Sequence, residues 1–214
     1  MSAELIVGRV FDIAVDEVLS ETVKRVMSKR TAEVRECLVE DLRTAGISIE
    51  EAAARDDVVA MMITLIEALR QGAATRNLRI IARVLADKAA HPERGTEDFI
   101  AWADSIKALT QQEIAYLLTH WRQYTQMTIN DVPAGSDPLK ATRDAVVGEL
   151  VGNGRLLGST QEYEMYGYSL LRTGFLTMVS IMGPCNCFVP TDRLSRLVEI
   201  AKLNEWAEGE LLHD

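Results

Sequence analysis

The feature that most constrains the fold is an apolar stripe along the first part of the chain. From about Ala3 to Ala45, aliphatic residues recur at intervals of three or four residues or their multiples: Val10, Ile13, Val18, Val26, Val34, Leu38 and Leu42. This period is that of one face of an α-helix. The segment predicts either one long helix or two helices broken near residues 28–31, and Gly46 follows as a stop.

A helix of roughly forty residues would be about 60 Å long. So long an apolar face is difficult to cover within a chain of 214 residues. We therefore predict that the protein forms homo-oligomers through its N-terminal helices.

Most of the remaining chain also has helical patterning. The run at residues 58–69 is apolar nearly all round, which predicts a buried helix. One face of this helical pattern continues through Gly72 and consists of these residues: Ile66, Leu69, Ala73, Asn77, Ile80 and Val84. This spacing predicts that the helix continues past Gly72.

Helix starts are marked by capping signals. Ser48 with Glu51, and Thr110 with Glu113, have the spacing of a capping box. Thr96 is a further candidate cap, and Asp137 precedes a proline in the first helical position.

Residues 109–176 resemble winged-helix domains in the order of their segments. A helix start at Leu109–Glu113 is followed by a helix carrying Val146 and Leu150, which runs into the sequence Gly154-Arg155-Leu156-Leu157. The sequences Tyr163–Tyr168 and Tyr168–Leu176 follow, and these resemble an aromatic strand, a turn and a closing helix. Many such domains have a Thr or Ser that caps the last helix, and this sequence has Leu171 at that position. Ser169 is the residue expected to cap that helix instead.

The predicted fold is therefore mainly α-helical, with one short β-ribbon near residues 155–169. Residues 1–95 are expected to form a bundle of long helices, residues 96–183 a winged-helix-like domain, and residues 184–214 a C-terminal loop and helix.

A shorter resemblance concerns genetic context. The sequence Ala74–Ala86, followed by Asp98-Phe99 and Leu109-Thr110, is similar to helical bacterial proteins of prophage and abortive-infection loci. It implies a bacterial protein of prophage or defence origin.

Composition and the chain start bear on compartment and partners. The net charge of −9 makes a general nucleic-acid coat unfavourable. Charges interrupt the first residues, which predicts neither a signal peptide nor a membrane span. Three cysteines (Cys37, Cys185 and Cys187) do not form a disulfide framework, so a cytoplasmic location is expected.

The histidines and cysteines suggest no catalytic or metal site. His91, His120 and His213 have no His or Cys neighbour at metal-ligand spacing. Cys185 and Cys187 are separated by one residue, and residues 152–158 miss the spacing of a dinucleotide motif. We expect no cofactor, no metal and no catalytic residue.

Two sets of side chains are candidates for contacts with nucleic acid or a partner. Arg76, Arg79 and Arg83 share one helix face, although pairing with nearby acids is the alternative. Tyr166 and Tyr168 would share one face of the predicted strand, where packing on the core is the alternative.

The resemblance adds a third set. It implies a recognition helix at about Asp137–Val151 with Lys140 and Arg143, and Arg155 just beyond it. Residues 96–183 contain six Lys and Arg against ten Asp and Glu, so few cations are uncompensated.

These observations favour a non-enzymatic regulatory or protein-interaction protein whose protein partner is not identified. The first alternative is a DNA-binding winged-helix transcriptional regulator, and the second is an enzyme whose site the sequence motifs do not reveal. Nucleic-acid binding is disfavoured by the charge, and no membrane association is expected.

Overall fold

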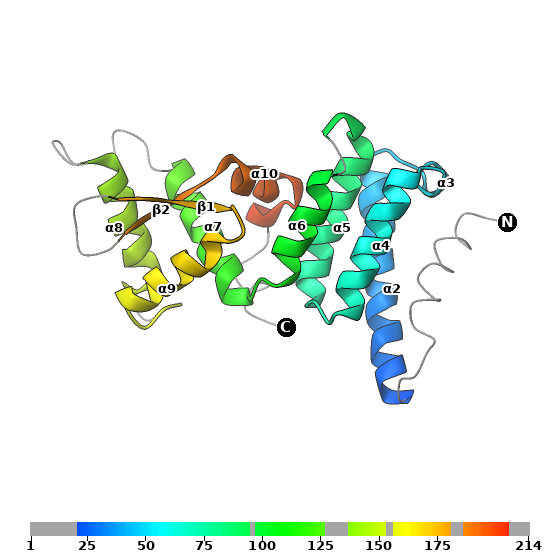
Figure 1. Ribbon diagram of the computed structural model, residues 1–214, viewed down its shortest axis with the longest axis horizontal. Helices are drawn as coiled ribbons and strands as arrows, with labels where there is room; N and C mark the ends of the chain where they lie inside the picture. The colour runs from blue at the N-terminus through cyan, green and yellow to red at the C-terminus, as the bar shows by residue number, and fades with distance from the viewer. Residues whose placement is uncertain (1–20, 95–96, 127–136, 153–155, 181–185, 206–214) are drawn as a thin grey trace. The chain divides into compact units, whose positions relative to one another are not determined.

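The computed structural model describes residues 21–94, 97–126, 137–152, 156–180 and 186–205 (Figure 1). Helices account for 76% of these residues, and the β-structure among them is a single two-stranded antiparallel sheet. The prediction of a mainly α-helical protein with one short β-ribbon is confirmed. None of the described helices is long and apolar enough to cross a membrane.

The chain divides into two compact units, Met1–Ala108 and Leu109–Asp214. The sequence prediction placed the first boundary after residue 95 instead. The helix between these two positions belongs to unit 1 because its buried residues Phe99, Trp102 and Ile106 face that unit's helices. The C-terminal residues 186–205 belong to unit 2 and form no separate part.

Unit 1 contains α2 (Glu21–Thr44), α3 (Ile49–Ala53), α4 (Asp56–Arg70), α5 (Thr75–Ala90), η1 (Pro92–Arg94) and α6 (Glu97–Lys107). Helix α5 is central, because it packs against α2, α4 and α6 (Figure 1). Its residues Leu78, Ile81 and Val84 are completely buried. Asn77, also on α5, donates to the carbonyl oxygens of Ile106 and Lys107 at 2.9 and 3.2 Å, and so caps the end of α6.

Helix α2 runs without a break across residues 28–31, so one helix is present there rather than two. It ends at Thr44, and beyond it Gly46 has a φ of 79°. The N–H of Ile47 donates to the carbonyl of Leu42 and that of Gly46 to the carbonyl of Arg43, each at 3.0 Å. This is a Schellman motif, and the predicted stop is confirmed.

The apolar stripe of α2 is covered within the chain where the structure describes it. Val34, Leu38 and Leu42 are at most 1% exposed, on the helix that packs against α5. The stripe residues Val10, Ile13 and Val18 lie outside the described residues. Self-association stays a prediction, and its support now comes from that earlier segment.

The prediction of a helix continuing through Gly72 is wrong. Helix α4 ends at Arg70 and α5 begins at Thr75. Gly72 has a φ of 83°, a conformation that residues with a Cβ rarely adopt, and the N–H of Ala73 donates to Ala68 at 3.1 Å. The turn lets α4 and α5 pack against each other instead of forming one rod.

The predicted caps at Ser48 and Asp137 are confirmed, whereas Ser169, the expected cap of a closing helix, lies inside the helix Thr160–Leu171. The Ser48 hydroxyl accepts from the N–H of Glu51 at 3.1 Å, and the Glu51 carboxylate accepts from the N–H of Ser48 at 2.9 Å. Asp137 caps the helix that starts at Pro138, accepting from the N–H of Leu139 at 2.9 Å. Thr96 lies outside the described residues.

Unit 2 contains α7 (Gln111–Gln126), α8 (Pro138–Leu150), α9 (Thr160–Leu171), β1 (Leu176–Val179), β2 (Cys187–Pro190), α10 (Asp192–Ile200) and η4 (Leu203–Glu205). Strands β1 and β2 pair antiparallel, with Leu176 opposite Pro190 and Val179 opposite Cys187. β2 packs against α7, α8 and α10, while β1 contacts α9 (Figure 1). The ribbon therefore lies at residues 176–190, and its predicted position at residues 155–169 is wrong.

Candidate interaction surface

The tyrosine-rich segment predicted to be a strand is helix α9. Ser159 is its N-cap, and its hydroxyl accepts from the N–H of Glu162 at 3.2 Å. The Glu162 carboxylate in turn accepts from the N–H of Gly158 at 2.8 Å. Ser159 and Glu162 have the spacing of a capping box, and this start signal outweighs the strand preference of tyrosine.

The inner side of α9 lies against the ribbon at unusually close range. Tyr163, Gly167 and Leu170 form this buried side. A Cβ at Gly167 would lie 2.2 Å from the Phe188 ring, closer than side chains approach. Phe188 therefore occupies the space left by the missing side chain, and its ring also meets that of Tyr163 edge-on at 5.7 Å.

A buried histidine joins α9 to α7. His120 is completely buried, and burial lowers its pKa to about 4, so the imidazole is neutral near pH 7. Its Nδ1 lies 2.9 Å from the carbonyl oxygen of Tyr116 and must donate to it, which leaves Nε2 to accept from the Tyr163 hydroxyl at 3.4 Å. The hydroxyl of Tyr116 donates to the carbonyl of Tyr163 at 3.0 Å. His120 thus orients α9 from inside the core.

A second buried contact joins α7 to β2. The Tyr124 hydroxyl lies 2.9 Å from the Sγ of Cys187, and that thiol donates to the carbonyl of Leu139 at 3.7 Å. Burial, with a smaller contribution from Cys187, raises the pKa of Tyr124 well above its usual value. Cys187 is completely buried, and Cys185 lies outside the described residues.

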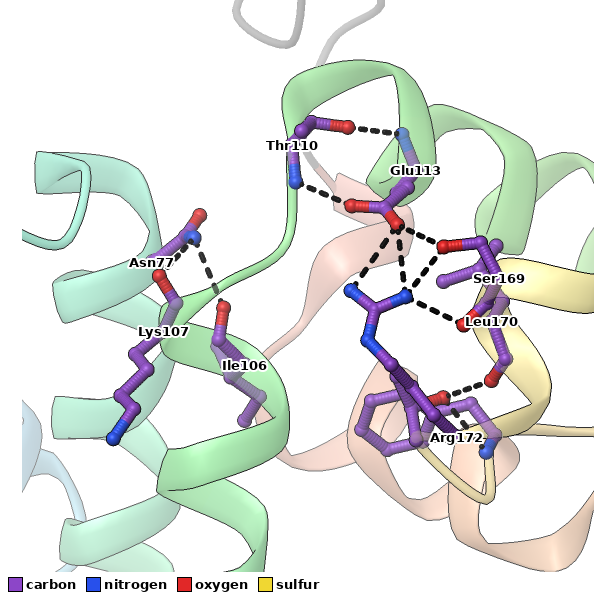
Figure 2. A network of polar contacts seen from close by, with 10 residues as sticks. Asn77, Ile106, Lys107, Thr110, Glu113, Ser169, Leu170 and Arg172 are labelled. Atoms are coloured by element: carbon purple, nitrogen blue, oxygen red, sulfur yellow. Dashed lines mark hydrogen bonds and ion pairs between the residues drawn. The ribbon is translucent and has the colours of Figure 1, made fainter. Parts of the chain in front are cut away.

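The end of α9 is tied to the start of α7 by a polar network (Figure 2). The Glu113 carboxylate is 5% exposed and accepts a hydrogen bond from the backbone N–H of Thr110 at 2.8 Å. In return, the backbone N–H of Glu113 donates to the Thr110 hydroxyl at 3.1 Å. These two bonds form the predicted capping box. The same carboxylate accepts from the Ser169 hydroxyl at 3.2 Å and from the Arg172 guanidinium at 3.3 Å. Arg172 is therefore engaged in holding the helix.

The outer side of α9 is apolar at its centre. Met165 is 61% and Tyr168 is 48% exposed, and their spacing of three residues makes them neighbours on the helix surface. Gln161, one turn before Met165, is also exposed. No Lys or Arg occurs in Thr160–Leu171, whereas Glu162 and Glu164 lie on either flank.

The apolar centre continues onto the ribbon. Tyr168 packs edge-on against Phe188 at 5.4 Å between ring centroids. Phe188 pairs with Met178, which is 41% exposed. Side chains of directly opposite residues share one face of the ribbon. We call these exposed or half-buried residues, which Phe188 links from both elements, the α9–β1 surface and define it by this set: Gln161, Glu162, Glu164, Met165, Tyr168 and Met178.

Asn186, which precedes β2, fixes the ribbon to this surface. Its N–H and its side-chain amide donate to the Glu164 carboxylate at 2.9 and 3.1 Å. The same amide donates to the Tyr168 hydroxyl at 2.6 Å. The Tyr168 hydroxyl is thus hydrogen-bonded and its ring contacts Phe188, while the residue as a whole stays 48% exposed.

Of the two tyrosines predicted as contacts, only Tyr168 belongs to the surface. Tyr166 is half-buried, stacks on Tyr116 at 6.0 Å, and donates to the side-chain oxygen of Gln112. The two rings were expected on one strand face, but residues two apart lie on nearly opposite sides of a helix. That expectation is wrong because the segment is helical.

The predicted recognition helix exists as α8, but its cations are placed differently. Lys140 is exposed. The Arg143 side chain is 1% exposed and donates twice to Asp144, at 2.6 and 2.8 Å, so it cannot reach a phosphate in this conformation. Arg155 lies outside the described residues.

The three arginines of α5 belong to unit 1. Arg76 is 8% exposed, Arg79 is exposed, and Arg83 lies 3.7 Å from Asp41 of α2. Burial raises the pKa of Cys37, a change that the nearby Arg79 and Arg83 oppose. Arg83 therefore pairs with an acid of α2, as the structural alternative predicts for this residue.

Among the described residues, no group of three or more His, Cys, Asp or Glu side chains could hold a metal ion. No protein-family model, curated protein or solved structure matches this chain. Sequence reasoning missed Met165, Met178 and Asn186, although the Ser159–Glu162 capping pair could have assigned Met165 to a helix surface.

Proposed function

We propose that this protein is a non-enzymatic regulatory protein that binds another protein through the α9–β1 surface of unit 2. The observation that carries the proposal is a helix without cations that exposes Met165 and Tyr168 side by side. Met and Tyr are enriched in protein–protein interfaces, where Tyr is a frequent energetic centre.

The winged-helix resemblance is part of this proposal. Three helices, an antiparallel ribbon and a further helix follow one another in unit 2. In that order the helix running into the first strand is α9, not α8. In this proposal the third helix of the winged-helix order is therefore Thr160–Leu171 and not residues 137–151. The surface that would contact a ligand then lies on Thr160–Leu171.

DNA binding is the alternative function, and the order of the elements favours it. Its weakness lies in the charge of the surface. Affinity for duplex DNA depends on phosphates neutralised by Lys and Arg, and specific base contacts rest on that binding. Glu162 and Glu164 would instead repel a phosphate backbone, and Arg172 already contacts Glu113.

The bacterial prophage or defence setting implied by residues 74–110 remains part of the proposal. Regulation by a protein contact is compatible with such a setting, and the surface itself does not depend on it. Neighbouring genes would test the setting directly.

The proposal is tested by placing a photo-reactive amino acid at Met165 in cells that express the native gene. Irradiation should give a discrete protein adduct, identified by mass spectrometry. The matched control is the same substitution at Ile100 of α6, which is 57% exposed in unit 1 and should not give that adduct.

A second measurement addresses the alternative. The purified protein is titrated with labelled random-sequence and genomic duplexes, first at low salt and then at about 150 mM salt, where surface charges are largely screened beyond ~8 Å. We expect weak or undetectable binding at the higher salt. A nanomolar duplex complex that Met165→Glu abolishes would replace protein binding with DNA binding.

A further inference from the structure

The α9–β1 surface combines features that favour one class of partner. Its apolar centre lies between two carboxylates, Glu162 on one side of α9 and Glu164 on the other. Glu164 also holds Asn186, so its charge is fixed in position. The first cation after the helix begins is Arg172, which is bonded to Glu113 and Ser169.

The charge of the whole unit has the same sign. Residues 109–214 contain eight Lys and Arg against thirteen Asp and Glu. A field of one sign attracts a partner of the opposite sign and raises its association rate. Complementarity therefore favours a cationic partner over a neutral or acidic one.

Tyr168 supplies the second element of recognition. Its ring contacts Phe188, its hydroxyl accepts from Asn186, and the residue is 48% exposed, so it needs little ordering when a ligand binds. Lys and Arg bind to exposed aromatic faces through cation–π attraction. Glu164 lies beside this ring and can pair with the same cation.

We propose that the α9–β1 surface binds a basic amphipathic helix of a partner protein. This inference rests on the proposed function and adds the chemical class of the partner. Apolar side chains of that helix cover Met165 and Met178, while its Lys or Arg side chains meet Tyr168, Glu162 and Glu164. An amphipathic helix presents such a stripe with flanking charges at three- and four-residue spacing.

The test uses the full-length protein and three labelled model peptides that share one leucine stripe. Their polar positions are all Lys, all Gln or all Glu, and binding is followed by fluorescence anisotropy. We expect the Lys peptide to bind about tenfold or more tightly than the Gln peptide, and the Glu peptide not to bind. Binding of the Lys peptide should weaken as salt is raised.

Variants locate the binding on this surface. Met165→Gln should weaken the Lys peptide roughly tenfold, the size of effect typical of an interface centre. The double variant Glu162→Gln with Glu164→Gln keeps both hydrogen-bond acceptors but removes both charges. It should reduce the preference for Lys over Gln without changing the circular dichroism spectrum.

A matched control comes from unit 1. Ile63 is 46% exposed on α4, and Glu67 is exposed one turn further on. The double variant Ile63→Gln with Glu67→Gln should leave binding unchanged. Equal weakening by this control would show general attraction to an acidic protein and would overturn the inference.

The remaining outcomes separate the inference from the proposed function. No binding of the Lys peptide overturns the inference, as does Gln-peptide binding of equal strength. If the Gln peptide binds as strongly as the Lys peptide but Met165→Gln weakens both, the surface would still be supported as a protein-binding surface. A nanomolar duplex complex of the protein that Met165→Glu abolishes, together with loss of the Met165 protein adduct, would reject both.

Discussion

The two units use different kinds of core. In unit 1 most buried residues of the central helix α5 are aliphatic, such as Leu78, Ile81 and Val84, and the buried polar residue Asn77 caps α6. In unit 2 the centre includes His120 and Glu113, which are hydrogen-bonded to α9 and its C-terminal end. An aliphatic core stabilises by removing area from water, whereas polar pairs require particular distances and directions. Unit 2 thus holds α9, and the surface it presents, in one position.

The largest expected effect tests the aliphatic core. Leu78→Ala should lower the free energy of unfolding by about 2–5 kcal/mol, because a completely buried leucine leaves a cavity. Chemical denaturation measures the loss, and hydrogen exchange should place it in α5. The loss should be the same at pH 5 and pH 7. A strongly pH-dependent loss would contradict the contrast between the cores.

The next effect concerns His120 in unit 2. The folded protein binds a proton at His120 only near pH 4, whereas the unfolded chain does so near pH 6.5. Between these values the unfolded state binds more protons, so stability falls as the pH falls. The total loss attributable to His120 is about 3 kcal/mol, from ~1.4 kcal/mol per pH unit.

This contribution is isolated by comparing pH profiles of stability for the native protein and His120→Gln. The variant should be less stable near pH 7 but should lose less stability between pH 6.5 and 4. Parallel profiles would mean that His120 does not couple acid to the core of unit 2.

A smaller effect is expected at the contact between α9 and the ribbon. Gly167→Ala places a methyl group where the Phe188 ring lies, so the ring must move. Overpacking of this kind typically lowers the free energy of unfolding by about 1–3 kcal/mol. Because Phe188 supports Tyr168, binding at the α9–β1 surface should weaken as well. An unchanged melting temperature would show that the ring has room to shift.

The smallest effect is expected for Gly148→Ala, the control for Gly167→Ala. It should change the free energy of unfolding in the opposite direction. Gly148 lies inside α8, and a Cβ there meets nothing within 4 Å. Gly148→Ala should therefore raise the free energy of unfolding by about 0.5–1 kcal/mol through helix propensity alone. Denaturant midpoints of the two glycine variants should move in opposite directions, and a shared direction would count against the close approach at Gly167.

Sequence reasoning succeeded where the signal is local. The capping pairs at Ser48 and Thr110 and the Asp137-Pro138 start were predicted because a cap depends on residues three or fewer positions apart. The stop at Gly46 was predicted for the same reason. The helical class followed from many such signals in agreement.

Reasoning from the sequence failed where distant segments decide the structure. The strand Cys187–Pro190 is specified by pairing with Leu176–Val179 and by contacts with α7 and α8, none of which a local pattern contains. The α9 segment was assigned to a strand by its tyrosines, although Ser159 and Glu162 marked a helix start. The candidate surface could not be assembled either, since it combines Met165 with Met178 from another element.

Pro190 has a consequence for how the ribbon meets other molecules. The N–H of Thr191 donates to the carbonyl of Phe175 at 3.0 Å, so Thr191 and Phe175 form a hydrogen-bonded pair. Such pairs alternate with non-hydrogen-bonded pairs along an antiparallel ladder, so the neighbouring pair of Pro190 and Leu176 is not hydrogen-bonded. The nitrogen of Pro190 therefore points away from β1, where its missing hydrogen breaks no bond within the ribbon. A strand approaching that edge of β2 finds no donor at this position. The same residue that fits the ribbon thus discourages its extension into an intermolecular sheet, a safeguard against aggregation.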